Sequence, residues 1–279
     1  MKKQCLGQEL KTEDIQKISY EILKEFKTFC EMHQLRYFMA YGTLLGAVRH
    51  EGFIPWDDDI DVFMPRPDYE KLLQLYKDNE SYQLYSPRKQ KEYCCGYMKL
   101  VNSNTYHYIP DGTFCRRGVD IDIFALDGQP DDIIEANKNF EKVFKKYERY
   151  CLRLIRYRYN TENGMLNLFK RLFARVMISS GIISKFAAYY DKRYSYYDYD
   201  VANYVGPSNA NLSGPFEFYE KGLFGSGVQL KFENEEFIAP IKYDRVLSLY
   251  FGEYMKLPPE DKRKSTHVER YYLIRKTGN

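Results

Sequence analysis

The sequence predicts an α/β protein with a helical insertion, and three observations support that prediction. Stretches with apolar residues at helical spacing alternate with short stretches in which apolar and polar residues alternate. Two of the short stretches, DIDVFM at 59–64 and VDIDIFALD at 119–127, share one acidic pattern. A length of 279 residues suits one large domain, or one domain with a sizeable insertion, around an ample hydrophobic core.

The first elements follow from apolar spacing and from residues that begin or end helices. Apolar residues recur at helical spacing from residue 12 to about residue 34, and Thr12 is interpreted as the N-cap of this helix. Residues 36–41 are predicted to form a short strand that Gly42 ends. We then expect Thr43 to cap a second, short helix.

The next elements continue the alternation of strands and helices. A strand at 59–64 is expected to end at Pro65 and Pro67, and a helix follows at about 68–78. Further strands are predicted at 82–86, 96–102 and 119–127. The order strand, helix, strand, helix is typical of an α/β fold.

The second half of the chain is predicted to be mostly helical at first and then rich in turns. Residues 131–192 have helical spacing, 206–227 are rich in turn residues, and a last helix lies at about 243–254. We therefore divide the chain into a core at 1–130, a basic, tyrosine-rich helical insertion at 131–200, and a C-terminal part at 201–279 that completes the core domain.

The net charge of +3 conceals an uneven distribution of charge. Residues 138–193 contain fourteen Lys or Arg and four Asp or Glu, an excess of ten positive charges, so the rest of the chain sums to −7. A run of basic residues of this kind usually forms a helical face that is exposed to solvent. A phosphate-rich partner, a membrane surface or nucleic acid would also suit it.

An apolar stripe runs through this basic block at 165–190. Arg175 and Lys185 interrupt its longest apolar stretch, so no membrane-spanning helix is expected. The stripe is typical of a helix that lies in a membrane interface, and equally of one that packs into the core or against a dimer partner. Both alternatives stay open.

The cysteines and the N-terminal stretch predict a cellular compartment. The six cysteines show no framework spacing, and the first residues lack the apolar core of a signal peptide. A core of this size needs no disulfide for stability. We therefore expect a reducing cytoplasm.

The most informative stretch is an acidic cluster beside the only tryptophan, Trp56. Asp57, Asp58, Asp59 and Asp61 lie within five positions, and the alternation of a strand would place Asp57, Asp59 and Asp61 on one face. Carboxylates at this spacing repel each other unless a cation lies among them. A hard divalent ion such as Mg²⁺, or Mn²⁺, would supply that charge, whereas a solvated acidic turn is the alternative.

Three further features favour a metal site. Gly42 and Thr43 stand at a strand-to-helix junction, where free backbone N–H groups favour a phosphate. The second acidic strand can supply a third carboxylate from a neighbouring position in the sheet. Arg49 and Lys99 are available to neutralise a phosphate. Together these are the parts of a metal-assisted phosphoryl-transfer site.

The segment YGTLLGAVRHEGFIPWDDDIDVFMPRPDYEKL at 41–72, with DIDIFALDG and YFGEYMKLPPEDKRKSTH, resembles the LicD family of phosphotransferases, whose distant relatives include fukutin and fukutin-related protein. The resemblance covers about 20–267 and is weakest across 140–200. It implies a nucleotidyltransferase-like mixed sheet flanked by helices. It also implies a CDP-linked donor, such as CDP-choline or, in eukaryotic relatives, CDP-ribitol, and a hydroxyl of a cell-surface glycan or teichoic acid precursor as acceptor.

Carried over to this sequence, the resemblance assigns roles to individual residues. The turn falls on Gly42 and Thr43, and the metal-binding pair on Asp59 and Asp61. The third catalytic and metal-binding carboxylate falls on Asp122, for which Asp120, on the same strand face, is a less suitable substitute.

Four other residues are candidates for donor binding: Arg49, Trp56, Lys99 and His267. Trp56 would suit a cation–π wall for a quaternary ammonium group, or else a packing anchor. His267 lies where the family pattern tends to carry histidine, although a surface histidine is the alternative.

The resemblance also sets the expected partners. These are CDP-choline or a related CDP-alcohol and a glycan or lipid-linked glycan acceptor, with peripheral contact at the inner membrane face and no nucleic acid. Two other functions stay open. One is a nucleotidyltransferase that acts on a small molecule, and the other is a non-catalytic module that binds a phosphoglycan or an anionic lipid.

Overall fold

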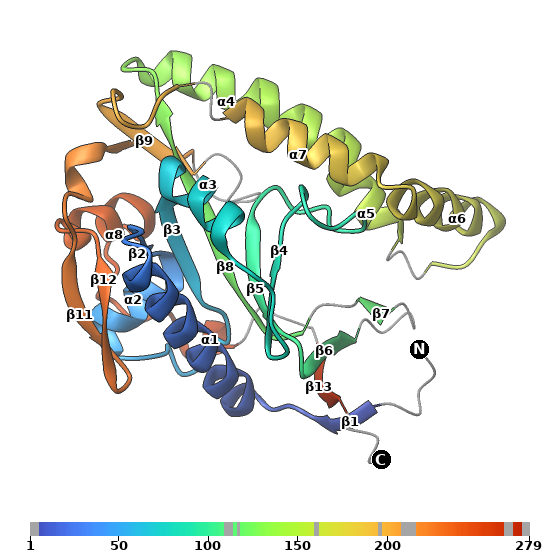
Figure 1. The fold of residues 1–279 in the computed structure, drawn as a ribbon, viewed down its shortest axis with the longest axis horizontal. Coiled ribbons are helices and arrows are strands. Elements are labelled where there is room, and N and C mark those ends of the chain that lie inside the picture. Colours follow the sequence, from blue (N-terminus) through green and yellow to red (C-terminus); the bar gives the residue numbers. More distant parts are fainter. Residues whose placement is uncertain are drawn as a thin grey trace.

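The structure is a computed structural model that describes residues 6–108, 114–115, 118–158, 162–194, 197–207, 216–264 and 270–274. A mixed β-sheet lies among helices, and a unit of long helices runs along one side of it (Figure 1). The predicted fold class, α/β with a mixed sheet flanked by helices, is therefore confirmed.

The large sheet consists of β2 (Phe38–Met39), β3 (Asp61–Pro65), β4 (Tyr82–Tyr85), β5 (Met98–Asn102), β8 (Asp120–Gln129), β9 (Tyr204–Pro207) and β10 (Tyr219–Glu220). Strand β8 is its centre. One edge of β8 pairs in parallel with β3, and the other edge pairs antiparallel with β5 along its first half and with β9 along its second. Strands β2, β4 and β10 extend the sheet by antiparallel pairing.

The burial of β3 and β8 explains their central place. Val62 and Met64 on β3, and Ile121 and Ile123 on β8, have no exposed surface. Strands that are covered on both faces are expected to have such apolar runs. Asp61 begins β3, and Asp120 and Asp122 lie at the beginning of β8, so these carboxylates meet at one end of the sheet.

Two smaller sheets were not predicted from the sequence. The first contains, in spatial order, β1 (Leu6–Glu9), β13 (Arg270–Ile274), β6 (Thr105–Tyr108) and β7 (Phe114–Cys115). The second is a hairpin of β11 (Val228–Phe232) and β12 (Glu235–Ala239). Because β1 pairs with β13, the first sheet joins two segments from opposite ends of the sequence.

The helices of the core are α1 (Thr12–Met32), α2 (Tyr41–His50), α3 (Arg66–Leu75) and α8 (Tyr243–Phe251), with short 3₁₀ turns at Lys221–Leu223 and Glu260–Lys262. Helices α1 and α3 contact β8, and α2 contacts β3.

Both predicted helix caps were wrong. The N-cap of α1 is Lys11, whose backbone N–H donates to the Asp14 carboxylate at 3.1 Å, so Thr12 is already the first helical residue. Helix α2 begins at Tyr41, after Ala40, and Thr43 therefore lies inside its first turn.

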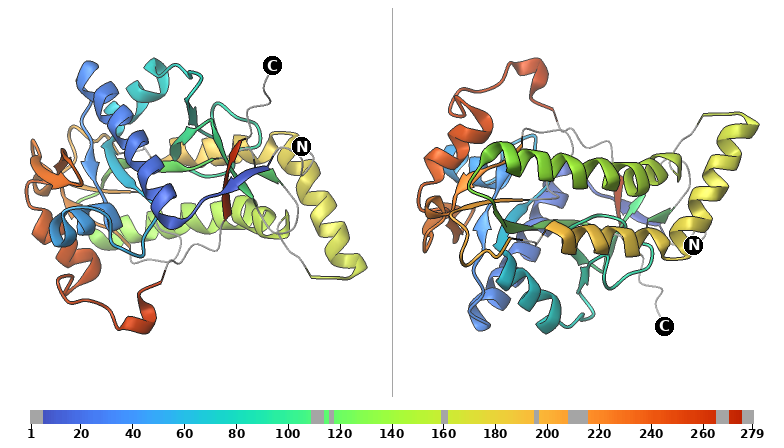
Figure 2. Two further views of the ribbon diagram at one scale, coloured as in Figure 1. Left: turned by 90° about the horizontal axis from the view of Figure 1, so that it is seen from below. Right: turned by 90° about the horizontal axis from the view of Figure 1, so that it is seen from above.

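The predicted helical insertion consists of α4 (Ile133–Tyr147), a π-helical turn (Glu148–Leu152), α5 (Arg153–Arg158), α6 (Met165–Ser179) and α7 (Ile182–Tyr194). Figure 2 shows α4 and α7 side by side, with α6 extending beyond their far end. The insertion has a small apolar core of its own, which contains Cys94, Tyr147, Cys151, Ile178, Ile183, Ala187 and Tyr190.

A buried network of ion pairs fastens the insertion to the large sheet. Arg66, at the start of α3, pairs with Asp127 on β8 at 2.6 Å and with Asp191 on α7 at 2.9 Å. Arg88 also pairs with Asp191, and with Glu70 on α3 at 2.5 Å. One carboxylate of α7 is thus shared by two arginines of the core.

Within the described residues, no single helix has the length and apolar composition needed to cross a membrane. Only Met165–Ser179 and Ile182–Arg193 meet that test, as a pair bent by 64°.

Candidate active site

The two acidic strands place their carboxylates beside each other. Asp61 is the first residue of β3, and Asp122 is its partner in the parallel register with β8. Asp59 lies two residues before β3 and contributes to the electrostatic environment of both. The structure therefore brings Asp59, Asp61 and Asp122 together, as the sequence predicted.

The electrostatics of this group show an excess of negative charge. Burial raises the pKa of Asp61 well above its usual range, and the charges of Asp59, Asp122 and Asp57 raise that pKa further. Burial also raises the pKa of Asp122 to about 6, while Lys99 acts in the opposite direction. The ionised forms of these carboxylates are energetically unfavourable in this environment. A cation bound among them would stabilise the ionised forms.

Lys99 lies among these carboxylates. It is the antiparallel partner of Asp122 on β5, and its ammonium group pairs with Asp122 and, at 2.6 Å, with Asp120. The Lys99 ammonium also lies 5.7 Å from the centre of the Tyr97 ring. Its contact with a donor phosphate stays a prediction, because here Lys99 neutralises part of the acidic group.

Thr43 and Gly42 fix α2 against the acidic segment. The buried hydroxyl of Thr43 accepts a hydrogen bond from the Asp61 backbone N–H at 2.8 Å. A Cβ atom added at Gly42 would lie 2.6 Å from a carboxylate oxygen of Asp57, so a larger residue there would require the Asp57 side chain to turn away. The N–H groups of these two residues belong to the helix turn that lacks intrahelical acceptors. Their contact with a phosphate stays a prediction.

Asp59 and Asp122 line a cavity of about 300 Å³, whereas Asp61, Gly42 and Thr43 are not among its described lining residues. Its lining is Ile15, Asp58, Asp59, Ile60, Cys95, Tyr97, Lys99, His107, Val119, Asp120, Asp122 and Tyr271. Strand alternation predicted that Asp58 would point away from Asp59, but both line the cavity. The reason is that 57–60 precede β3 and do not follow its alternation.

One wall of the cavity comes from the unpredicted four-stranded sheet. His107 on β6 and Tyr271 on β13 are partners in the register, and their rings stack with centroids 5.0 Å apart. Tyr271 is 149 residues from Asp122 in the sequence, and no local pattern reveals that the two meet.

Arg49 and Trp56 are not among the described residues that line this cavity. Arg49 donates to the backbone carbonyl of Tyr254 at 2.8 Å. The Arg263 guanidinium lies 5.9 Å from the Trp56 ring, and His50 meets that ring edge-on. Trp56 thus already has a cationic partner from the chain, while His267 lies outside the described residues.

The acidic group fits a divalent cation in its chemistry. Asp59, Asp61 and Asp122 offer oxygen ligands, which Mg²⁺ and Mn²⁺ prefer, and more negative charge than Lys99 balances. In the described part of the chain, no three His, Cys, Asp or Glu side chains already gather as a ligand set. Binding would therefore require Lys99 to move away from Asp122.

Comparison with known proteins gives one family and three relatives. The model of "LicD/FKTN/FKRP, nucleotidyltransferase domain" matches residues 34–156. The chain is 28% identical over 268 residues to the lipopolysaccharide cholinephosphotransferase LicD of Haemophilus influenzae, across 93% of this chain and 97% of that protein.

The two other relatives are uncharacterized proteins. One, from Rickettsia prowazekii, is 28% identical over 139 residues, which are 48% of this chain and 44% of that protein. The other, from Rickettsia typhi, is 36% identical over 61 residues, which are 21% and 20% of the two chains.

Proposed function

Because the chain belongs to the LicD family and is a phosphotransferase, we propose that it transfers phosphocholine from CDP-choline, or the phospho-alcohol of a related CDP-alcohol, to a glycan hydroxyl and releases CMP. The observation that carries this proposal is the in-register pair of Asp61 and Asp122 within a chain similar to a cholinephosphotransferase along nearly its whole length. A cell-surface glycan or a teichoic acid precursor is the proposed acceptor.

Each residue of the acidic group has a role in this reaction. Asp59, Asp61 and Asp122 would hold Mg²⁺ or Mn²⁺, which when bound neutralises charge on the donor diphosphate. Gly42 and Thr43 would bind a donor phosphate through backbone N–H groups. Lys99 is already within reach of the same space, so it would exchange its carboxylate partner for a phosphate oxygen.

The reaction itself follows from the donor. The acceptor hydroxyl attacks the phosphorus that bears the alcohol, in line with the bond to the CMP oxygen, which breaks as the new P–O bond forms. The hydroxyl proton passes to a carboxylate, and Asp122 is the proposed base because it lines the cavity in which the reaction would take place.

The test is the release of CMP by purified protein with Mg²⁺ from CDP-choline, CDP-ribitol, ATP and UDP-glucose, together with calorimetric binding of each. We expect turnover and tighter binding with a CDP-alcohol. Preference for ATP would instead support the nucleotidyltransferase that acts on a small molecule. Absence of turnover on all four donors, with retained binding of a phosphoglycan, would support the non-catalytic module.

We also propose that the protein is cytoplasmic and contacts the inner face of a membrane. The side chains of Met165, Leu166, Leu168, Phe169, Leu172, Phe173 and Val176 on α6 are 48–87% exposed. Only Ala174 and Ile178 of α6 are buried, so most apolar residues of this helix do not pack into the core, whereas Ile183, Ala187 and Tyr190, further along the stripe, do. Lys170, Arg171 and Arg175 lie on the same helix. An apolar face beside basic residues suits an anionic lipid surface, where lipid-linked acceptors would be found.

A further inference from the structure

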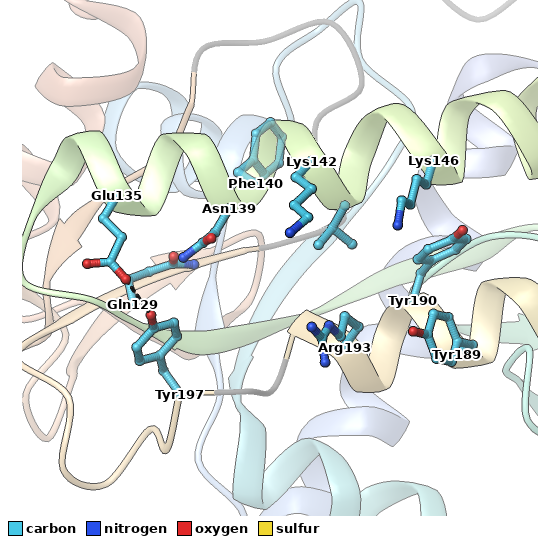
Figure 3. A pocket seen from close by; sticks show the side chains of 11 residues that line it. Gln129, Glu135, Asn139, Phe140, Lys142, Lys146, Tyr189, Tyr190, Arg193 and Tyr197 are labelled. Carbon is cyan, nitrogen blue, oxygen red and sulfur yellow. Dashed lines mark hydrogen bonds between the residues drawn. The ribbon is translucent and has the colours of Figure 1, made fainter.

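A second cavity, of about 410 Å³, lies between α4 and α7 (Figure 3). It shares no lining residue with the cavity at Asp59 and Asp122, which is called the catalytic cavity below. Lys142 and Lys146 project from α4 toward α7, and Arg193 projects from α7 on the opposite side. One carboxylate, Glu135, also lines the cavity, and it accepts a hydrogen bond from the Tyr197 hydroxyl at 2.9 Å. With three cations and one carboxylate, the cavity favours a ligand with negative charge.

The remaining lining suits a ligand that is larger than a bare anion. Tyr189, which is 58% exposed, presents its ring to the cavity and lies edge-on to Tyr190 with ring centroids 5.3 Å apart. The side-chain amides of Asn139 and Gln129 add hydrogen-bond donors and acceptors. Aromatic faces pack against the C–H faces of sugar rings, amides bind hydroxyls, and Lys and Arg bind phosphate or carboxylate groups.

The position of the cavity separates it from the reacting phosphate. Gln129 is seven residues beyond Asp122 on β8, which corresponds to about 23 Å of extended strand. A donor whose phosphorus lies at the catalytic carboxylates would not reach this far, whereas an oligosaccharide can.

The cavity is nevertheless connected to the active site. At the C-terminal end of α4, the Tyr147 hydroxyl donates to the Cys94 carbonyl at 2.8 Å, and the next residue, Cys95, lines the catalytic cavity. Tyr147 also contributes to the electrostatic environment of Tyr97, which lines the catalytic cavity too. The insertion that walls the α4–α7 cavity therefore packs, through Tyr147, against residues next to the catalytic cavity.

We infer that the α4–α7 cavity binds a negatively charged saccharide segment of the acceptor, remote from the hydroxyl that is modified. Its identification as part of the acceptor rests on the proposed function, but the binding of a charged saccharide does not.

The experiment measures calorimetric binding of trehalose 6-phosphate, a phosphorylated disaccharide, with trehalose and inorganic phosphate as separate probes. The variant is Lys142→Gln with Lys146→Gln. Its matched control is Lys138→Gln with Lys145→Gln, which removes the same charge from the same helix at exposed residues that do not line the cavity. A third variant, Tyr189→Ala, removes the exposed ring.

We expect the wild type to bind trehalose 6-phosphate at least tenfold more tightly than either simpler probe. The Lys142 and Lys146 variant should weaken that binding at least tenfold, and the control less than twofold. Tyr189→Ala should weaken binding of trehalose 6-phosphate but not of phosphate. Asp61→Asn should bind trehalose 6-phosphate like the wild type, because the site lies outside the catalytic cavity.

Several results would overturn the inference. The first is that the wild type does not bind trehalose 6-phosphate, and the second is that the two double variants bind it with equal affinity. The third is loss of binding in Asp61→Asn. The fourth is displacement of the probe by CDP-choline, which would identify the cavity as a nucleotide site. Failure of the proposed reaction is distinguishable, since a protein that binds the probe here but releases no CMP from any CDP-alcohol would refute the reaction alone.

Discussion

At the scale of single residues, Asp61 has the most crowded electrostatic environment of the site. Its carboxylate is buried beside Asp122 and within the influence of Asp59 and Asp57, and Lys99 is the cation that offsets them. The proposed function uses this arrangement to hold a divalent ion against the donor phosphates. Asp59, Asp61 and Lys99 should therefore respond to mutation as parts of one group.

We expect Asp61→Asn and Asp59→Asn to reduce CMP release by about a hundredfold or more, because charge that stabilises the transferring phosphate is lost. The exposed Asp200→Asn is the matched control. Mg²⁺ should raise the melting temperature of the wild type and of Asp200→Asn but not that of Asp61→Asn. Full activity of either site variant, or of the wild type in excess EDTA, would contradict the assignment.

Gly42 is expected to be intolerant of a methyl group. Gly42→Ala would place Cβ 2.6 Å from the Asp57 carboxylate, so either that carboxylate or the first turn of α2 must shift. Because the Asp57 carboxylate is the end of a flexible side chain, the loss of stability should be about 1 kcal/mol or less, but displacement of Asp57 or of α2, which positions Asp61 through Thr43, should lower kcat/KM. Urea unfolding and CMP release measure the two effects.

Gly222→Ala is the control for Gly42→Ala. A Cβ atom at Gly222 meets no atom within 4 Å, so this variant should be close to neutral in both measurements. Equal behaviour of the two variants would show that the close approach of Asp57 to α2 is unimportant.

Glu217 predicts a pH dependence of stability. It accepts hydrogen bonds from the hydroxyls of Tyr41, at 2.6 Å, and Tyr219, at 2.8 Å, and burial raises its pKa to about 7. The Glu217 carboxyl group therefore stays protonated up to a higher pH in the folded chain than in the unfolded chain, where a glutamate titrates near 4.5. Stability is therefore lost as the pH rises from about 4.5 to about 7, by about 3 kcal/mol from this group.

Glu217→Gln should remove this loss because an amide does not titrate. Relative to the wild type, the variant should become more stable between pH 5 and pH 8, as followed by thermal unfolding, whereas the exposed Glu220→Gln should show no such trend. A difference between Glu217→Gln and the wild type that stays constant with pH would contradict the assignment.

At the scale of elements, the strongest local patterns were predicted and the long-range pairings were not. The acidic strands β3 and β8, helix α1 and the helical insertion were recognised because apolar spacing within each segment is sufficient to reveal them. The hairpin of β11 and β12 was missed because its turn carries Glu233, with a positive φ of 57°, and not the Asn-Gly or Asp-Gly pair that marks such turns.

The candidate site was likewise predicted only where local sequence was sufficient. The presence of Asp61 and Asp122 on adjacent strands was predicted from their acidic pattern and from family resemblance. The pairing of Lys99 with Asp120 and Asp122 depends on the register of β5 on β8, and the wall formed by Tyr271 depends on a sheet closed by the last strand. Those contacts arise from tertiary packing, which local sequence does not encode.

The attachment of α7 to the core can be tested at Asp191. Asp191→Asn would leave the buried guanidinium of Arg66 and its neighbour Arg88 with one fewer carboxylate. Removing one partner from a buried ion network is strongly destabilising, and we expect a loss of about 2–4 kcal/mol because Asp127 and Glu70 remain. Amide hydrogen exchange should accelerate in α4 and α7 more than in α1.

Asp200→Asn serves again as control for Asp191→Asn, since it removes the same charge from an exposed position. Uniform acceleration of exchange across α1, α4 and α7 would show that the network stabilises the whole molecule and not the attachment of the insertion.

At the scale of the whole molecule, charge and exposed apolar surface are concentrated in the insertion. The segment 138–193 carries an excess of ten positive charges, and the remainder of the chain sums to −7. The apolar residues of α6 extend beyond the α4–α7 pair (Figure 2). In the proposed membrane contact, this distribution would orient the insertion toward the anionic surface and leave the acidic candidate site on the core.

We expect the wild type to co-sediment with phosphatidylglycerol vesicles at low salt and not with phosphatidylcholine vesicles, since each basic residue near an anionic surface contributes about 1 kcal/mol. Arg171→Glu with Arg175→Glu should weaken that binding at least tenfold. Phe169→Ser with Phe173→Ser should do the same without a change of charge, because it removes exposed apolar surface.

Analytical ultracentrifugation distinguishes the alternative of a dimer partner. A dimer that Phe169→Ser with Phe173→Ser dissociates, without any vesicle binding by the wild type, would assign the α6 stripe to self-association and remove the membrane contact.

Strand β8 carries Asp122, the proposed catalytic carboxylate, near one end and reaches the α4–α7 cavity with Gln129 at the other. Between them, Asp127 is held in the buried ion network that fixes α7. The strand thus sets a constant distance between the proposed binding site for a charged sugar and the proposed site of reaction. Such an enzyme would select the sugar to be modified by its distance, along the acceptor saccharide, from a charged group. Acceptors that differ only in that distance would be modified at different sugars or not at all.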